Sequence, residues 1–389
     1  MGLLDPVRHQ LLPVDARRAM RFAERVSGLH DYGGGAMHER LEETIDVVSR
    51  VDWNVLGRFG LRYILNWHLT NRLRLVELLK RRPRLERVVI ERPLIVTGLF
   101  RTGTTYLHNL LAADPSNRAA HTWEVARPVG RKRDLMVDEA WRKWRTGHEV
   151  SMDDIIVPEQ AEAHRVTVDG WEEDFFLLEN DMAIMKFFVG FGAYDYGMRM
   201  LEWDMVEPYG WHKKQLQVLW AQRSADRWLL KCPWHLWNLE ALLKVYPDAC
   251  IVQTHRDPVS TIGSQCSLSA RIAMKFQRGL DLHDVGRFWL EYSRLGIARG
   301  DEARARFPRA RIYDVHADDL QTKPLDVVRD MYAYFDLPFD EALDAKLRAR
   351  VATEPTAQAG DHEYDSAHYG LSVSRIEGAF SEYRARFAA

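Results

Sequence analysis

The sequence predicts an α/β protein in which a parallel β-sheet is flanked by helices. Two patterns predict this class. From residue 93 onward, short apolar runs alternate with stretches of helical periodicity, which is typical of βαβ units. Before residue 91, apolar residues recur mainly at the three- and four-residue spacings of helices. We therefore expect an N-terminal helical extension over residues 1–90 and an α/β domain over residues 91–389.

The individual elements follow from the same patterns, taken in chain order. Helices of the extension are expected at 16–29, 38–53 and 58–80. Strands are expected at 94–97, 119–122, 228–231, 250–254 and 311–315. Helices of the α/β domain are expected at 104–113, 209–224, 236–245, 258–269, 284–305, 324–335 and 341–351. Residues 130–206 are rich in aromatic and acidic residues without a clean period, and we interpret them as a helical and aromatic cap insertion.

Composition and charge limit the classes of function that the protein can have. The chain has 389 residues, with 54 Lys and Arg against 56 Asp and Glu, and this balance argues against a protein that binds nucleic acid mainly by charge. Three cysteines without a C-x-x-C pair predict neither a disulfide framework nor a zinc site. No signal-peptide pattern and no apolar run of transmembrane length occurs in the sequence, so we expect a cytoplasmic protein.

The most informative segment runs from Pro93 to Leu107. An apolar strand leads into a glycine-bounded turn and then a helix, which is the P-loop-like geometry that binds phosphate. The spacing from Gly98 to Gly103 fits the Walker A pattern, except that Thr104 stands where the pattern has Lys. The missing Lys argues against ordinary ATP or GTP hydrolysis. Arg101, inside the loop, would point a cation at the group being transferred.

Two further clusters follow later strands of the predicted sheet. Lys231 ends one strand and is followed by Pro233 and His235. Arg256 follows another strand, and Ser264 lies eight residues later on the next helix. Because ligands bind at the carboxyl edge of such sheets, we expect both clusters there. An arginine fork with a helix hydroxyl would form a second anion site, separate from the first.

These motifs together resemble the sulfotransferases that use 3'-phosphoadenosine 5'-phosphosulfate, and most of all their bacterial, notably mycobacterial, branch. The resemblance covers about residues 92–388. It implies a loop for the 5'-phosphosulfate, a site for the 3'-phosphate, adenosine 3',5'-bisphosphate as product, and no metal. The residues implied for the loop are Arg101, Thr102, Gly103, Thr104 and Thr105, and those implied for the 3'-phosphate are Arg256 and Ser264.

The resemblance also raises expectations for the adenine and for the C-terminal segment. Tyr106 stands where cytosolic members have Trp, and it would stack on adenine. The glycine-rich C-terminal loop of those enzymes is not recognisable here. In its place lies the segment from Gly360 to Tyr364, in which His362 or Tyr364 would close over the nucleotide, the alternative being a plain polar loop.

Sulfuryl transfer requires cations around the moving group and a base for the acceptor hydroxyl. Arg101 and Lys231 are the candidate cations. The resemblance favours Glu124 as the base, because several sulfotransferase branches carry a glutamate at that position. The rival candidates for the base are His121, His164, His235 and Glu173.

The function expected on these grounds is sulfuryl transfer to a hydroxyl of a small acceptor. Thirteen Trp, several of them near the cap, favour an apolar or aromatic acceptor. The alternative is a P-loop kinase or a nucleotide-binding protein without sulfotransferase activity, for which the missing Walker Lys is unfavourable. We expect no nucleic-acid partner, and a homodimer is compatible with the sequence.

Overall fold

The computed structural model describes residues 15–131, 136, 138–158, 165–353 and 366–387. At its centre, five parallel strands form one sheet in the order β2-β3-β1-β4-β5. Their bounds are β1 Leu94–Gly98, β2 Asn117–Ala119, β3 Arg227–Lys231, β4 Cys250–His255 and β5 Arg311–His316. The central strands are buried along their whole length, as expected for a sheet covered on both faces. The predicted α/β class is confirmed.

One predicted strand is wrong in position. The pattern indicated residues 119–122, but β2 ends at Ala119, and α6 begins at Thr122. The reason is a cap: Glu124 accepts a hydrogen bond from the backbone N–H of His121 at 2.8 Å, which starts a helix where the strand was expected to continue. The first turn of the helix predicted over 236–245 also differs, because it belongs to the 3-10 helix η2.

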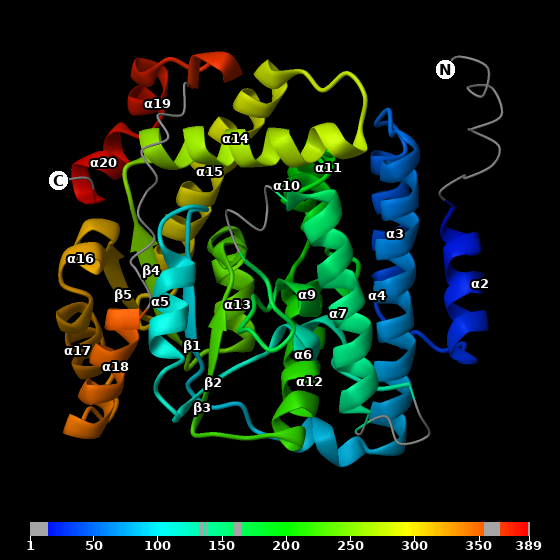
Figure 1. Cartoon of the computed structure of the whole chain (residues 1–389), viewed down its shortest axis with the longest axis horizontal. Helices are drawn as coiled ribbons and strands as arrows, with labels where there is room; N and C mark the ends of the chain where they lie inside the picture. The colour runs from blue at the N-terminus through cyan, green and yellow to red at the C-terminus, as the bar shows by residue number, and fades with distance from the viewer. Residues whose placement is uncertain (1–14, 132–135, 137, 159–164, 354–365, 388–389) are drawn as a thin grey trace.

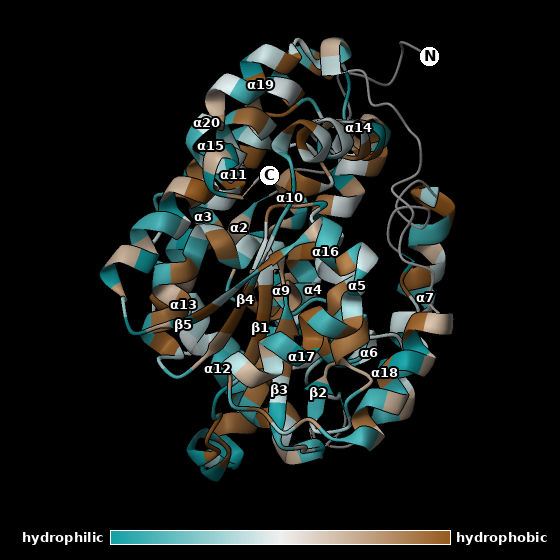
Figure 2. Ribbon diagram, turned by 90° about the vertical axis from the view of Figure 1, so that its left-hand side faces the viewer, coloured by the Kyte–Doolittle hydropathy of each residue, from teal (hydrophilic) through white to brown (hydrophobic). Residues whose placement is uncertain are grey.

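Helices cover both faces of the sheet. In Figure 1, α16, α17 and α18 lie on one side, α3, α4, α7 and α12 lie on the other, and α14 crosses the top of the view. In Figure 2, β1 and β4 are brown in the interior, and the surrounding helices show teal outward. The helices that precede β3 are α2 Ala16–Ser27, α3 Met37–Val48, α4 Val55–Arg81, η1 Pro83–Arg87, α5 Thr104–Leu111, α6 Thr122–Ala126, α7 Glu139–Ile156, α9 Phe175–Glu179, α10 Lys186–Val189, α11 Tyr194–Met200 and α12 Val206–Gln222. Those that follow β3 are η2 Pro233–Asn238, α13 Leu239–Val245, α14 Pro258–Phe276, α15 Leu282–Arg306, α16 Ala317–Thr322, α17 Pro324–Tyr334, α18 Glu341–Thr353, η3 Ser366–Tyr369, α19 Val373–Ala379 and α20 Ser381–Phe387.

The long helix α4 joins the N-terminal helices to the segment that carries the site. Asn54 caps it by accepting from the N–H of Gly57, and most of its residues are buried, which fits its weak apolar periodicity. Arg72 of α4 donates to Asp181 at 2.6 Å, and His68 lies 3.0 Å from Glu179. Both acidic partners belong to the stretch that includes α9. The N-terminal helices and residues 173–181 therefore share one buried interface.

The segment between α7 and α9 leads the chain to the end of β3. Residues 165–172 run across α6, where Thr122 donates its N–H to the carbonyl of Gly170 at 2.9 Å. Asp174 then donates its N–H to the carbonyl of Lys231 at 3.3 Å. The insertion is thereby fixed to the sheet edge at which β3 ends. Within the described ranges, every helix is too short or too polar to cross a bilayer.

Candidate active site

The loop after β1 is shaped by residues with positive φ. Gly98 (φ 148°) and Gly103 (φ 89°) bound it, and Arg101 has φ 68°. A methyl group on Gly98 would lie 2.5 Å from Oγ1 and 2.6 Å from the carbonyl oxygen of Thr254, so only glycine fits. The Arg101 conformation is uncommon for a residue with a side chain and recurs at functional loops. The loop leads into the N-terminus of α5, an arrangement suited to phosphate groups.

Two residues predicted as ligand contacts turn their side chains inward. Thr102 donates from Oγ1 to the carbonyl of Leu99 at 2.7 Å, and the same hydroxyl lies 2.6 Å from Oγ1 of Thr254. Its side chain therefore ties the loop to β4. Tyr106 is only 9% exposed and packs in the hydrophobic cluster that α5 forms with β1 and α17. That Tyr106 stacks on adenine stays a prediction, and the structure places its ring against this cluster.

The two predicted anion sites meet in the structure. Arg101 donates from Nε to Oγ of Ser264 on α14 at 3.3 Å. Arg256, just after β4, donates from Nη1 to the carbonyl of Arg101 at 3.4 Å. The sequence pointed to separate sites, but β4 pairs directly with β1, so their carboxyl ends are adjacent. Two guanidinium groups and a hydroxyl consequently gather on the β4 side of the loop.

Lys231 occupies the other flank, because β3 pairs with β1 on the side opposite to β4. Its Nζ lies 3.4 Å from Oγ1 of Thr105, in the first turn of α5. The same atom lies 2.5 Å from Oε1 of Glu173. The Lys231 side chain is 1% exposed and that of Glu173 is 15% exposed. A buried cation and a partly open carboxylate thus face the helix that begins at the loop.

Glu124, the base favoured by the resemblance, lies in a buried ion pair. Its Oε1 accepts from Nη2 of Arg118 at 2.7 Å, and its Oε2 is 3.3 Å from Nη2 of Arg223. The same Oε2 caps α6 by accepting from the N–H of His121. The carboxylate is 1% exposed and has partners on both oxygens. These contacts give Glu124 a structural task at the β2–α6 junction.

The other candidates for the base differ in their surroundings. His235 is 1% exposed, and both of its ring nitrogens have partners. His121 is half-buried, and its ring stacks with that of Trp123. His164, His362 and Tyr364 lie outside the described residues. Among the described candidates, Glu173 is the one whose carboxylate contacts the predicted cation Lys231.

Sequence reasoning missed a buried acid beside this pair. Asp174 follows Glu173 directly, accepts from the N–H of Lys231 at 3.0 Å, and bonds His212 and His235. Only the acidic and aromatic run Trp171 to Phe176 hinted at it, because His212 lies far away in sequence. A periodicity argument cannot pair residues from an irregular segment and a distant helix.

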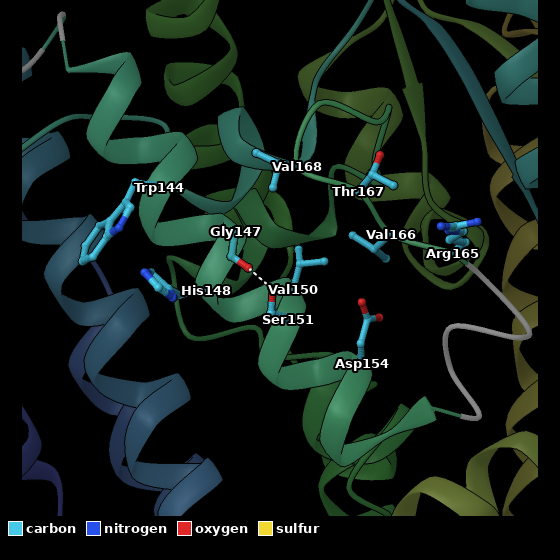
Figure 3. A pocket seen from close by; sticks show the side chains of 10 residues that line it. All are labelled: Trp144, Gly147, His148, Val150, Ser151, Asp154, Arg165, Val166, Thr167 and Val168. Atoms are coloured by element: carbon cyan, nitrogen blue, oxygen red, sulfur yellow. Dashed lines mark hydrogen bonds between the residues drawn. The ribbon is translucent and has the colours of Figure 1, made fainter.

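A groove of about 520 Å³ opens beside α7 (Figure 3). On one side, Trp144, His148 and Ser151 come from α7, and on the other, Val166 and Val168 come from the segment that crosses α6. None of the predicted site residues that the structure describes lines it. The segment that forms one wall continues to Glu173, so groove and ion pair are connected through a short stretch of chain.

The described parts of the chain form no cluster of metal ligands. There, no group of three or more His, Cys, Asp or Glu is placed to hold an ion. Cys232, Cys250 and Cys266 are buried free thiols. Burial raises the pKa of the Cys232 and Cys266 thiols, which makes them unreactive at neutral pH. The side chains that the structure brings together around the loop carry guanidinium, ammonium, hydroxyl and carboxylate groups.

Comparisons with known proteins agree with this geometry. A profile of the sulfotransferase family matches residues 93–341. An omega-hydroxy-beta-dihydromenaquinone-9 sulfotransferase from Mycobacterium bovis is 24% identical over 307 residues, which cover 75% of this chain and 72% of that protein. The crystal structure of a sulfotransferase from Mycobacterium avium has a TM-score of 0.84 and 28% identity, with 96% of each chain covered. A sulfotransferase from Mycobacterium tuberculosis H37Rv has a TM-score of 0.79 and 29% identity, covering 95% of this chain and 99% of the other.

Proposed function

Since this chain belongs to the sulfotransferase family and is a sulfotransferase enzyme, we propose that its donor is 3'-phosphoadenosine 5'-phosphosulfate. The observation that carries the proposal is the meeting of Arg101, Ser264 and Arg256 on one flank of the loop, with Lys231 on the other. A donor with anionic groups at both ends of one nucleoside needs cations at more than one position. ATP, by contrast, would need the Walker Lys that Thr104 replaces.

The residues fit the donor in two groups. Arg101 and the glycine-bounded turn hold the 5'-phosphosulfate at the start of α5. Arg256 and Ser264 hold the 3'-phosphate, because a guanidinium fork and a hydroxyl suit a phosphate dianion. Arg101 bonds Ser264 directly, so its side chain reaches from one group to the other. The product, adenosine 3',5'-bisphosphate, would keep both sets of contacts.

Lys231 stabilises the charge that develops as the sulfuryl group leaves the donor. Its Nζ lies beside Thr105 in the first turn of α5, so it faces the group held by the loop. The lysine is desolvated, and a preorganised cation in such an environment lowers the barrier more than the same charge in water. In-line transfer then needs only that the acceptor oxygen approach from the side opposite to the leaving phosphate oxygen.

We assign the base to Glu173 instead of Glu124. The carboxylate of Glu173 is partly open and contacts Lys231, whereas that of Glu124 is closed by two arginines and a backbone amide. Glu173 would accept the acceptor's proton as the oxygen attacks, and Lys231 would hold the carboxylate in place. Because the base and the cation are neighbours, the acceptor oxygen and the sulfuryl group are also held close together.

The acceptor we propose is an apolar or aromatic alcohol. Phe100, in the loop, is half-buried against the rings of Trp237 and Trp289. Phe176, three residues after Glu173, is also half-buried. The curated relative from Mycobacterium bovis is named for a hydroxylated dihydromenaquinone, which is an apolar acceptor of this kind.

The donor assignment is tested by thermal shift. Adenosine 3',5'-bisphosphate should raise the melting temperature of the protein, and ATP with or without Mg²⁺ should do so much less. Preference for Mg²⁺-ATP would overturn the proposal in favour of a kinase-like protein. Transfer of radiolabelled sulfate to a panel of phenols, steroids and isoprenoid alcohols tests the acceptor class. Tight bisphosphate binding without transfer to any of them would indicate a nucleotide-binding protein that lacks the activity.

A further inference from the structure

We propose that Asp174 is a positioning residue that holds Lys231 and Glu173 in their relative places. Two buried arms orient Asp174, and each is a histidine bonded to a tyrosine: His212 with Tyr246, and His235 with Tyr209. The inference rests on the proposed function, because it assigns Lys231 and Glu173 to the sulfuryl-transfer site. The carboxylate of Asp174 bonds Lys231, His212 and His235, and in the described part of the chain it bonds neither Thr105 nor the loop, so it acts through its neighbours. One carboxylate oxygen bonds the end of β3 at the sheet edge, and the other bonds the histidines of the two arms.

The first oxygen fixes the end of β3. Asp174 Oδ1 accepts from the backbone N–H of Lys231 at 3.0 Å, and the N–H of Asp174 donates to the carbonyl of Lys231 at 3.3 Å. This double contact sets the position of the Lys231 backbone relative to residue 174. Because Glu173 is the preceding residue, the same contact also sets the distance from which its carboxylate reaches Nζ of Lys231. One residue thus determines the spacing of the cation and the base.

The second oxygen accepts from two histidines. Nε2 of His212 lies 2.8 Å and Nε2 of His235 lies 2.9 Å from Oδ2 of Asp174. Nδ1 of His212 bonds the hydroxyl of Tyr246 at 2.8 Å, and Nδ1 of His235 bonds that of Tyr209 at 2.7 Å. The arms therefore connect Asp174 to α12, to η2 and to the C-cap of α13.

Chemistry fixes the direction of the bonds to the carboxylate. An ionised carboxylate only accepts, so both Nε2 atoms carry protons. In the neutral ring of His212 the remaining Nδ1 is an acceptor, and the hydroxyl of Tyr246 donates to it. Although burial alone would raise the pKa of Asp174, the two histidines bring it well below its usual range, and burial lowers the pKa of His212. The carboxylate is ionised and His212 is neutral at neutral pH.

The tyrosines consequently fix the plane of each ring. If a tyrosine hydroxyl were removed, Nδ1 of that ring would be buried without a partner, although the carboxylate would still require the proton on Nε2. The ring would then be held by one hydrogen bond instead of two, and Asp174 would lose part of its orientation. All five residues are at most 1% exposed, so no water replaces the lost contact easily. The network is therefore rigid only while both arms are complete.

A matched pair of Tyr→Phe variants tests the proposal. Tyr209→Phe removes the hydroxyl that is bonded to Nδ1 of His235, and Tyr332→Phe removes a hydroxyl that donates to Asp114 at 2.8 Å. Tyr332 is equally buried, but it lies at the amino end of the sheet, next to Asn117 at the start of β2. Both variants should lose similar stability. We expect kcat to fall roughly tenfold or more in Tyr209→Phe, with the dissociation constant of adenosine 3',5'-bisphosphate within about twofold, and no change in kcat in Tyr332→Phe. Equal kcat values in the two variants would overturn the proposal.

Two substitutions at His235 provide a rescue test. His235→Gln can place an amide N–H near the former Nε2 and keep the donor to Asp174, whereas His235→Leu cannot. We expect the Gln variant to keep most of the wild-type kcat and the Leu variant to lose it, with melting temperatures reported for both. If kcat instead falls in parallel with the melting temperature, whether or not the donor to Asp174 is kept, the network only stabilises the fold.

A structural readout separates this inference from the proposed function. Crystal structures of the wild type and of Tyr209→Phe should differ in the separation of Lys231 Nζ and Glu173 Oε1, and hydrogen exchange in the peptide that contains the Lys231 amide should be faster in the variant. If the wild type transfers no sulfate, the proposed function fails, but these two measurements still decide whether Asp174 positions the pair. Unchanged separation and unchanged exchange would refute the positioning role.

Discussion

Lys231 Nζ lies 2.5 Å from Oε1 of Glu173, and both side chains stand at the carboxyl edge of the sheet beside the first turn of α5. The lysine is brought there by β3 and the glutamate by an irregular segment that crosses α6. An ion pair at 1% and 15% exposure is shielded from solvent, so each charge depends on the other.

Lys231→Met should remove the cation while keeping the aliphatic volume. We expect kcat to fall about 10²–10³-fold, the usual cost of losing one group that stabilises transition-state charge. The dissociation constant of adenosine 3',5'-bisphosphate, measured by calorimetry, should change little, because Arg101 and Arg256 remain. Lys244→Met is the control, since Lys244 forms only an exposed pair with Glu240. A normal kcat in Lys231→Met would remove Lys231 from the mechanism.

Glu173→Gln should abolish most turnover. The amide keeps an oxygen for Lys231 but cannot take a proton from the acceptor, so kcat should fall about 10²–10⁴-fold, the usual contribution of a general base. Steady-state kinetics with saturating donor measures this. Turnover near the wild-type rate would exclude Glu173 as the base and return the role to another carboxylate or histidine.

Glu124→Gln should behave in the opposite way. Removing the charge leaves Arg118 buried without its counter-ion, and breaking such a pair costs about 3–5 kcal/mol of folding free energy. Urea unfolding measures the loss. The folded fraction should keep a kcat close to that of the wild type. A stable Glu124→Gln protein that is catalytically dead would show that the resemblance pointed to the right base.

Gly98→Ala should damage the loop. The new methyl group would press on the backbone oxygen of Thr254, which cannot rotate away, at a φ that side chains rarely adopt. We expect a loss of about 2 kcal/mol or more in stability and weaker bisphosphate binding. In Gly210→Ala, by contrast, the methyl group meets nothing within 4 Å, and alanine in a helix is favoured by about 1 kcal/mol. Equal behaviour of the two variants would contradict the close packing at Gly98.

Acid should weaken the fold in two steps. Burial lowers the pKa of His212 and His255, so the unfolded chain binds those protons first, and stability falls as the pH drops below about 6.5. Although burial would raise the pKa of Asp314, bonds from His255 and Arg304 lower it to about 2. Its contribution is present above about pH 4 and is lost as the pH falls toward 2.

Asp314→Asn separates these two steps. Urea unfolding at pH 7, 5 and 3 should show that the variant is less stable than the wild type at pH 7 and that the difference narrows at pH 3. The step below pH 6.5 should remain, because His212 lies in another network. If the difference in unfolding free energy stays constant over this pH range, the contacts with His255 and Arg304 do not lower the pKa of Asp314.

The parallel sheet was predictable because its main strands are short apolar runs, of which β1, β3 and β4 are buried along their whole length. Four of the five strands lie within one or two residues of their predicted bounds. Strand β2 was misplaced because a local cap by Glu124 overrides the weak apolar run there. The arginine partners of Glu124 could not be predicted from local pattern, because they come from β2 and from the end of α12.

By itself, the sequence determined the glycine-bounded loop and the cationic residues at the ends of β3 and β4, and from these it predicted two anion sites. These properties depend on residues close together in the chain, whose spacing dictates local geometry. Tertiary structure alone decided that the two predicted sites touch, that Tyr106 packs in a buried cluster, and that Glu173 pairs with Lys231. Asp174 and its histidines became visible only there as well, because burial and contact between distant segments arise from packing, which no local pattern encodes.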